Sequence, residues 1–193
     1  MAKASAAPAT IAIVCGLGNP DADYERTRHN AGFATVDVLA ARHDVRYWKS
    51  EAGAQVASLT WRGADGEQRE VLLAKPMSYM NTSGGPLSKL ARAHHVVPQQ
   101  ILVVHDEVDL AAGEVRLKLG GGLNAHNGLR SIADKLGSRD FARVQFGIGR
   151  PPGKMQVADY VLRELKGGFF DEFNITVERA ADLVERILTE GAK

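Results

Sequence analysis

Polar side chains that could carry out acid–base chemistry follow the short apolar runs of this sequence. Residues 11–17 (IAIVCGL) form an apolar run of strand length that ends at Gly18, which predicts a buried central strand. Asn19 follows at the carboxyl end of this strand, and His29 lies in the loop ten residues further on. Because ligands of open α/β sheets bind beyond the carboxyl ends of the strands, we expect Asn19 and His29 to share one rim of a cleft.

Two later segments bring further polar residues to the same rim. Residues 75–85 (KPMSYMNTSGG) form a polar, glycine-rich connection that places Met80 and Asn81 between a strand and a helix. The apolar run 101–104 is stopped by polar residues that include Asp106, so a buried strand presents a carboxylate where it ends.

A third segment, residues 120–128 (GGGLNAHNG), leads into a helix and places His126 and Asn127 at the start of that helix. The strand ends would thus gather a base candidate, a partner carboxylate and three amides, namely His29, Asp106, Asn19, Asn81 and Asn127.

The chemistry that suits this set is hydrolysis. A neutral imidazole has a pKa of about 6.5 and can take a proton from water, and a carboxylate on its other nitrogen would orient it and stabilise the imidazolium. Asparagine side chains both donate and accept hydrogen bonds, so they can hold a water and a substrate carbonyl. The residues therefore predict attack on an activated acyl bond by a water that His29 activates. Each residue also has a structural interpretation: Asp106 could be a solvated strand end, and Asn81 could cap the following helix.

The elements that must position these side chains alternate between strand and helix. After the first strand we expect a helix at 32–43, a hairpin of strands 54–61 and 71–74, a helix at 86–96, a strand at 114–119, a helix at 129–136 that stops at Gly137, a strand at 141–148 and a long terminal helix striped by Phe169, Phe170, Phe173, Val177, Ala180, Val184 and Leu188. This order predicts an α/β fold: one three-layer α/β/α domain with a mixed, mostly parallel twisted sheet at residues 10–193, after a flexible tail at 1–9.

Composition narrows the class of protein. A chain of 193 residues with 45% hydrophobic content can bury a sizeable core. The single cysteine, Cys15, falls inside the first strand, where a buried inert thiol is expected and an intrachain disulfide is impossible, which suits a reducing cytoplasm. No apolar run approaches the length needed to span a membrane, and nothing calls for a partner subunit, so we expect a cytoplasmic monomer.

The formal net charge is only +1, but it is distributed unevenly. Residues 113–150 hold seven basic and three acidic side chains, a local charge of +4, whereas residues 154–193 have a local charge of −2. A polyanion would be steered toward the first region. An ordinary solvated surface explains the same counts equally well.

A nucleotide-binding module is a second hypothesis, because Gly16 and Gly18 follow a strand. The dinucleotide fingerprint requires a third glycine where this chain has Asp21, and it requires the helix to begin at once rather than near Gly32. The hypothesis therefore fails.

Five segments carry a resemblance to a known family. They are GLGNPDADYERTRHNAG, KPMSYMNTSG, HDEVDL, GGGLNAHNGL and GIGRPPG, and in this order and spacing the chain resembles bacterial peptidyl-tRNA hydrolase over nearly its whole length after the tail. The resemblance implies an esterase that cuts the bond between a peptide and the 3′-terminal ribose of tRNA, recycling peptidyl-tRNA lost from ribosomes. It implies no metal and no organic cofactor.

The resemblance also implies a role for each matching residue. His29 is the general base, Asp106 polarises and orients it, and Asn19 keeps His29 and the substrate in register. The residues that face the substrate are Tyr24, Met80, Asn81, His126 and Asn127, and the candidates for contact with tRNA phosphates are Lys118, Arg116 and Arg143.

The chain departs from the family pattern at four positions. Asp21 stands where the family usually has glycine, and Asn124 and Ala125 replace a second glycine pair. Gln145 stands where an arginine often assists at the phosphate, and Arg143, on the same strand face, is the hypothesised substitute. These departures keep open an alternative from another class, a non-catalytic protein that binds the tRNA acceptor.

Overall fold

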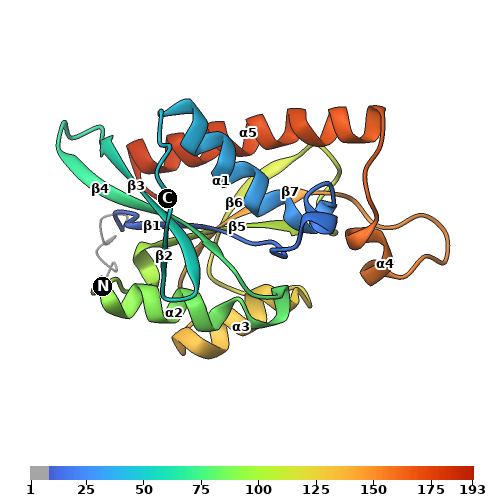
Figure 1. Cartoon of the computed structure of the whole chain (residues 1–193), viewed down its shortest axis with the longest axis horizontal. Coiled ribbons are helices and arrows are strands. Elements are labelled where there is room, and N and C mark those ends of the chain that lie inside the picture. The colour runs from blue at the N-terminus through green and yellow to red at the C-terminus, as the bar shows by residue number, and fades with distance from the viewer. Residues whose placement is uncertain (1–8) are drawn as a thin grey trace, which may run out of the picture.

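The computed structural model describes residues 9–193, and a seven-stranded sheet forms its middle layer in the order β2-β3-β4-β1-β5-β7-β6 (Figure 1). The strands are β1 (Ile13–Gly16), β2 (Lys49–Glu51), β3 (Ala54–Arg62), β4 (Gln68–Pro76), β5 (Ile101–Glu107), β6 (Val115–Leu119) and β7 (Ala142–Gly147). The four central strands β4, β1, β5 and β7 are parallel, and the pairs toward both edges are antiparallel.

Helices cover both faces of the sheet, and Figure 1 shows α1 and α5 on one side and α2 and α3 on the other. The helices are α1 (Ala31–Arg42), α2 (Gly84–Ala93), α3 (Asn127–Leu136), α4 (Val157–Leu162) and α5 (Gly168–Glu190). Short 3₁₀ turns lie at Ala22–Tyr24, Arg28–Asn30, Met80–Thr82 and Pro98–Gln100. The predicted three-layer α/β/α architecture is confirmed.

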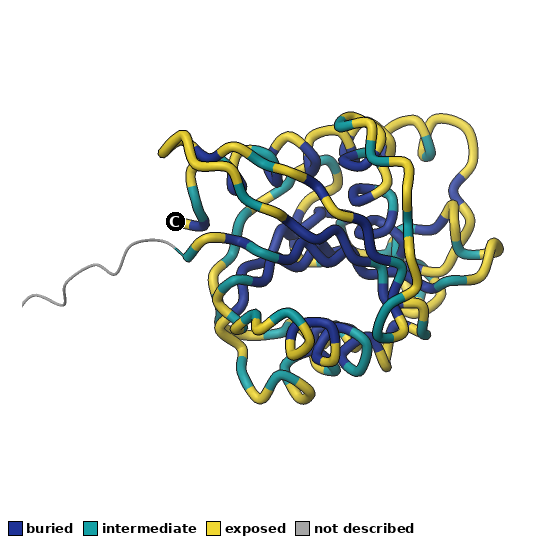
Figure 2. Tube along the Cα trace, turned by 60° about the vertical axis from the view of Figure 1, so that its left-hand side comes forward, coloured by how far each residue is buried: buried dark blue, intermediate teal, exposed yellow. Residues whose placement is uncertain are grey.

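Apolar side chains of the sheet pack in two clusters, one under each helical layer. Strand β1 alternates between them, since Val14 packs toward α1 and α5 while Ile13 and Cys15 pack toward α2 and α3. All four residues of β1 are buried, and the burial map of Figure 2 shows the dark blue core in the middle of the molecule. A strand covered on both faces must be apolar throughout, which is why the run of residues 11–17 stands out in the sequence.

Close backbone packing brings α1 directly onto β1. A methyl group placed on Gly32, in the first turn of α1, would overlap the backbone of Leu17 and Val104. Only glycine allows this approach, and the approach holds the preceding 3₁₀ turn, with His29, against the carboxyl end of the sheet.

The predicted helices and strands are confirmed to within a few residues, with three differences. Helix α4, with six residues, and the edge strand β2, with three, are too short to show a periodic pattern in the sequence. Phe169, predicted to belong to the apolar stripe of α5, is 69% exposed because it lies at the very start of that helix.

Strand β5 extends three residues beyond its predicted end and includes His105, Asp106 and Glu107, all of them buried. The extension pairs with β7, where Asp106 stands beside Phe146 and Glu107 beside Gly147. Polar residues continue the strand because their side chains find hydrogen-bond partners within the protein. The carboxylate of Asp106 is therefore part of the sheet and not of a solvated loop.

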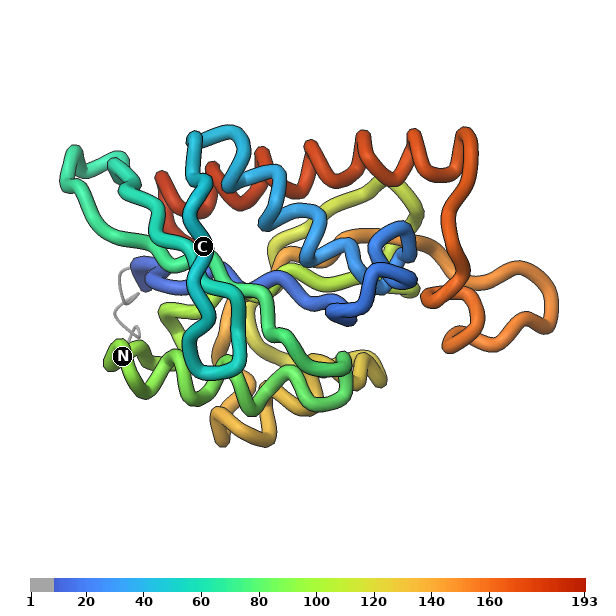
Figure 3. Tube along the Cα trace, viewed as in Figure 1, coloured from blue at the N-terminus to red at the C-terminus, as the bar shows by residue number. Residues whose placement is uncertain are grey.

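The predicted flexible tail lies outside the described residues except for Ala9, and the domain boundaries stay a prediction. Within residues 9–193, no helix is both long enough and apolar enough to cross a membrane. Figure 3 follows the chain by colour and shows the loop after β1 (blue) beside the segment of α4 (orange), where α4 contacts the 3₁₀ turn of His29.

Candidate active site

A cleft of about 740 Å³ opens beyond the carboxyl ends of β1, β4 and β5. Its lining includes Asn19, Tyr24, His29, Met80, Asn81, Asp106, His126 and Asn127, which are all eight of the residues predicted to act in catalysis or to face the substrate. No serine, threonine or cysteine belongs to the described lining. The described lining thus offers imidazole, carboxylate and amide groups for chemistry.

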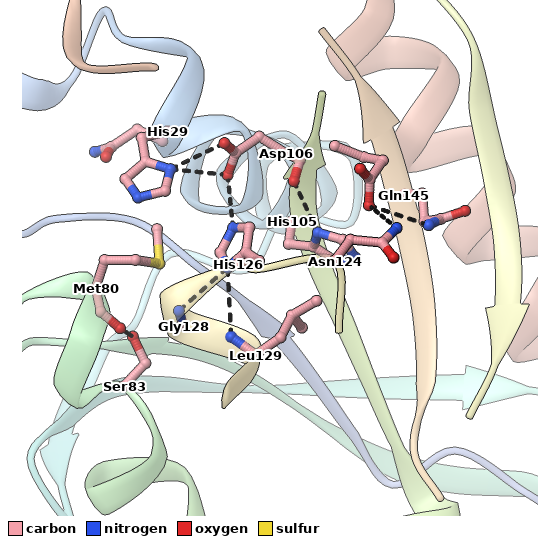
Figure 4. A network of polar contacts seen from close by, with 12 residues as sticks. His29, Met80, Ser83, His105, Asp106, Asn124, His126, Gly128, Leu129 and Gln145 are labelled. Carbon is pink, nitrogen blue, oxygen red and sulfur yellow. Dashed lines mark hydrogen bonds and ion pairs between the residues drawn. The ribbon is translucent and has the colours of Figure 1, made fainter. Parts of the chain in front are cut away.

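His29 and Asp106 form the centre of the cleft (Figure 4). The Nδ1 atom of His29 lies 2.9 Å from Oδ2 and 3.0 Å from Oδ1 of Asp106, although 77 positions separate the two residues in the chain. Asp106 accepts, so Nδ1 carries the proton and Nε2 keeps its lone pair. Among residues 9–193 Nε2 has no hydrogen-bond partner, which leaves it available to a water in the cleft.

His126 is a second partner of the same carboxylate. It is the N-cap of α3, where its Nδ1 accepts hydrogen bonds from the backbone N–H groups of Gly128 and Leu129 at 3.2 and 3.3 Å. Nδ1 is therefore unprotonated, and Nε2 must carry the proton that it donates to Asp106 Oδ1 at 3.0 Å. Helix capping thus fixes the tautomer of His126, and this neutral imidazole orients Asp106.

Burial and the neighbouring groups shift the pKa values of both Asp106 and His29. Burial by itself would raise the pKa of Asp106, but the charge of His29 and the hydrogen bonds from both imidazoles outweigh it and hold this pKa well below its usual range. Burial would lower the pKa of His29, but the Asp106 carboxylate outweighs it and raises the pKa of His29 above its usual value. An ionised Asp106 thus makes His29 a stronger base.

A third histidine, His105, is buried next to Asp106 and His126 and stays neutral. Burial lowers the pKa of His105 to about 3, and its Nδ1 donates a hydrogen bond to the backbone oxygen of Asp106 at 2.8 Å. Its ring meets that of His126 edge on, with the centroids 5.1 Å apart. His105 therefore packs behind His126 without adding a charge.

Asn19 is held in place from two sides. Its backbone N–H and C=O are both bonded to the side chain of Asn30, at 2.9 and 3.0 Å, and its own Oδ1 accepts from the backbone N–H of Met80 at 2.8 Å. With Oδ1 engaged, its Nδ2 group is the free end in the cleft. The role of Asn30 could not be predicted from the sequence, because its partner lies eleven positions away and no periodicity links the two.

The remaining substrate-facing candidates differ in exposure. Met80 is buried, with its sulfur close to the backbone of Gly128 on α3. Asn81 and Asn127 are exposed and line the cleft from two neighbouring segments, and Tyr24 is half-buried in a 3₁₀ turn at its rim. Asp21, one of the departures, accepts a hydrogen bond from the hydroxyl of Tyr79 at 3.3 Å and leaves Asn19 and His29 in place.

Three ligand atoms from His29, Asp106 and His126 lie within 4.8 Å of one another, close enough to suggest a metal site. The positions of the imidazole protons favour a different interpretation of this cluster. Since the helix cap occupies Nδ1 of His126, its Nε2 carries a proton and has no lone pair to offer a metal. The contacts to Asp106, at 2.9 and 3.0 Å, have the lengths of hydrogen bonds. The arrangement therefore suits proton transfer.

The three basic residues assigned to tRNA phosphates lie in different surroundings. Lys118 and Arg116 lie on the edge strand β6, where Arg116 is exposed and Lys118 is half-buried with its Nζ 3.5 Å from the Gly122 oxygen. Arg143 is 1% exposed, and its guanidinium donates to the backbone oxygens of Gly120 and Gly122. The prediction that Arg143 contacts phosphate, in place of an arginine at position 145, is therefore wrong: its donors hold the glycine-rich loop.

The fold and the cleft define a class of protein, a three-layer α/β/α protein whose cleft holds an imidazole–carboxylate pair of the kind found in hydrolases. Comparison with known proteins gives the family. Residues 13–193 match the sequence model of peptidyl-tRNA hydrolase, and the chain belongs to this family.

Known relatives cover almost the whole chain. The peptidyl-tRNA hydrolase of Nocardia farcinica is 50% identical over 180 residues, 93% of this chain and 91% of the relative, and that of Frankia alni is 48% identical over 179 residues, 93% and 88% of the two chains. The crystal structure of peptidyl-tRNA hydrolase from Acinetobacter baumannii superimposes with a TM-score of 0.82 at 33% identity, covering 92% of this chain and 88% of that one.

Proposed function

We propose that this protein hydrolyses the ester bond between a peptide and the 3′-terminal ribose of tRNA, and so recycles peptidyl-tRNA released prematurely from ribosomes. Membership of the family supports the substrate. The observation that carries the chemistry is the His29–Asp106 pair at 2.9 Å, with the other imidazole nitrogen free in the cleft.

The reaction proceeds through two proton transfers. Nε2 of His29 takes a proton from water as the water oxygen attacks the ester carbonyl carbon, and Asp106 stabilises the imidazolium that forms. The carbonyl oxygen becomes an oxyanion, for which the side-chain amides of Asn19 and Asn127 are the donors at hand. When the tetrahedral intermediate collapses, the imidazolium returns the proton to the departing ribose oxygen. No step passes through a metal or an organic cofactor.

The other predicted residues surround this centre. Tyr24, Met80 and Asn81 face the peptide, His126 and Asn127 face the ester and the acceptor end, and Lys118 and Arg116 attract tRNA phosphates. The substrate is made by cytoplasmic ribosomes, so the proposed compartment is the cytoplasm. The protein is proposed to act as a monomer, because every catalytic group comes from one chain.

The direct test measures release of a short N-blocked peptide from tRNA by the purified protein, with free aminoacyl-tRNA as the control substrate. We expect cleavage of the peptidyl ester and little cleavage of the aminoacyl ester. A protein that binds peptidyl-tRNA and never releases the peptide would instead be a non-catalytic acceptor-binding protein.

A further inference from the structure

A second polar cluster lies directly beside the catalytic pair, and Glu107 is its centre. Glu107 is the last residue of β5 and is 4% exposed. Its Oε2 accepts hydrogen bonds from Nδ2 of Asn124 at 3.0 Å and from Nε2 of Gln145 at 3.3 Å, and its Oε1 accepts from the backbone N–H of Asp109 at 3.0 Å. Both oxygens of a buried carboxylate are thus satisfied, as burial of a charge requires.

The loop that carries Asn124 has an unfavourable backbone conformation. Asn124 and Ala125 follow one another with φ angles of +47° and +59°, in the left-handed region that residues with a Cβ atom avoid. Asparagine tolerates this region, but alanine has no side chain with which to compensate. The loop therefore needs a contact from outside, and Asn124–Glu107 is the side-chain bond that ties it to the end of β5.

His126 comes immediately after this strained pair. Its Nδ1 is fixed by the first turn of α3, so the backbone of residues 124 and 125 decides whether its Nε2 reaches Asp106. A loop released from Glu107 could relax out of the left-handed region and draw His126 away from the carboxylate.

We propose that Glu107 and Asn124 form a clamp that positions His126 against Asp106 and thereby sets the basicity of His29. The inference rests on the proposed function, in which His29 is the general base. Glu107 and Asn124 are positioning residues, since their side-chain bonds join them to each other and not to His29. Gln145 supports the clamp with a neutral amide, which donates to the same carboxylate oxygen at 3.3 Å.

Three substitutions separate the effect of the Asn124–Glu107 hydrogen bond from the effect of the backbone conformation. Asn124→Asp keeps the shape and the tolerance of positive φ but replaces the donor with a repelling oxygen, and Asn124→Gly relieves the backbone but removes the donor. For both we expect kcat to fall about tenfold, the size of a coupling between groups in contact. The matched control Ala125→Gly relieves the neighbouring residue and leaves the donor, so kcat should stay within about twofold.

A reciprocal exchange tests the pairing itself. In the double variant Glu107→Gln/Asn124→Asp an amide at 107 donates to a carboxylate at 124, which restores the bond in the opposite direction with the same net charge. We expect kcat to return to within about threefold of the wild-type value, whereas each single substitution stays about tenfold low. Losses that simply multiply in the double variant would overturn the proposal.

NMR of the imidazole nitrogens gives a readout that needs no substrate. Asn124→Gly adds no charge, so if His126 leaves Asp106 the pKa of His29 should rise, because the carboxylate then has one donor fewer. An unchanged His29 pKa together with wild-type kcat in Asn124→Gly would refute the clamp. If the wild-type protein releases no peptide, the proposed function fails, while the titration still decides the clamp.

Discussion

The carboxylate at the centre of the cleft is buried and hydrogen-bonded, whereas the charged side chains of the basic edge strand β6 lie closer to the solvent. In the cleft, Asp106 is 3% exposed and is bonded by two imidazoles at 2.9 and 3.0 Å. On β6 the side chain of Arg116 is 65% exposed and pairs with Glu114 only two positions away. The first region fixes its charges in one geometry, and the second leaves them free to move.

This difference predicts different kinetic roles. A buried and hydrogen-bonded charge interacts strongly and keeps its neighbours at shifted pKa values, as chemistry requires. An exposed charge is screened by salt and contributes mainly to attraction and steering of a charged substrate. Substitutions in the cleft should therefore change kcat, and those on β6 should change KM and its dependence on salt.

The largest effect is expected for His29→Ala. Loss of the general base should reduce kcat by on the order of a thousandfold while binding of peptidyl-tRNA changes little. Single-turnover peptide release and a separate tRNA-binding measurement check both parts. The matched control is His94→Ala, which removes the same side chain from a surface pair with Glu51 at 2.6 Å. Equal losses in the two variants would refute the role of His29.

The next largest effect is expected for Asp106→Asn, with a fall in kcat on the order of a hundredfold because the neutral amide no longer fixes the tautomer of His29. The acid limb of kcat against pH should also move. In the wild type, Asp106 raises the pKa of His29, so activity is lost as pH falls through a value above about 6.5. Without the carboxylate only burial remains, and the limb should move to lower pH. An unmoved limb would assign it to another group.

A stability effect is expected for Arg143→Ala. This buried guanidinium donates to the backbone oxygens of Gly120 and Gly122, and its removal takes the donor from Gly120 and leaves Gly122 only the long contact with Lys118. The free energy of unfolding should fall by about 2 kcal/mol, measured by denaturant unfolding. If stability is unchanged while the salt dependence of tRNA binding falls, Arg143 would belong with the phosphate contacts after all.

The smallest effect is expected for Lys118→Ala. We expect a rise in KM of about threefold, a salt slope of tRNA binding reduced by about 1, and no change in kcat, because a cation on the edge strand contributes phosphate attraction. Lys166→Ala, a substitution of an exposed lysine paired with Glu164, is the control. A lower kcat with an unchanged salt slope would place Lys118 in the chemistry instead.

Much of the fold could be predicted because its signals are local. The apolar run of residues 11–17, the hairpin of β3 and β4, and the stripe of α5 each follow from the spacing of neighbouring residues. The edge strand β2 and helix α4 could not be predicted, since three and six residues are too few to show a period. The length of β5 was underestimated because polar residues continue a strand when β7 and neighbouring side chains satisfy them.

The site shows the same division. The polar residues at the strand ends were singled out from the pattern and the resemblance, and all eight candidates for catalysis and substrate contact line one cleft. The burial of Arg143 could not be predicted from the sequence. An arginine within a strand has the same sequence pattern whether its side chain contacts phosphate or backbone oxygens. The contact of Asn124 with Glu107, which joins positions 17 apart, could not be predicted either.

The sequence by itself determined the layer architecture and which residue types stand at the carboxyl ends of the strands, since periodicity and glycine placement act between neighbours in the chain. Only the tertiary structure decided which imidazole nitrogen carries a proton, which cations are buried, and that Asp106 has two histidine partners. Those properties depend on distances and desolvation between residues far apart in sequence, and packing alone sets them.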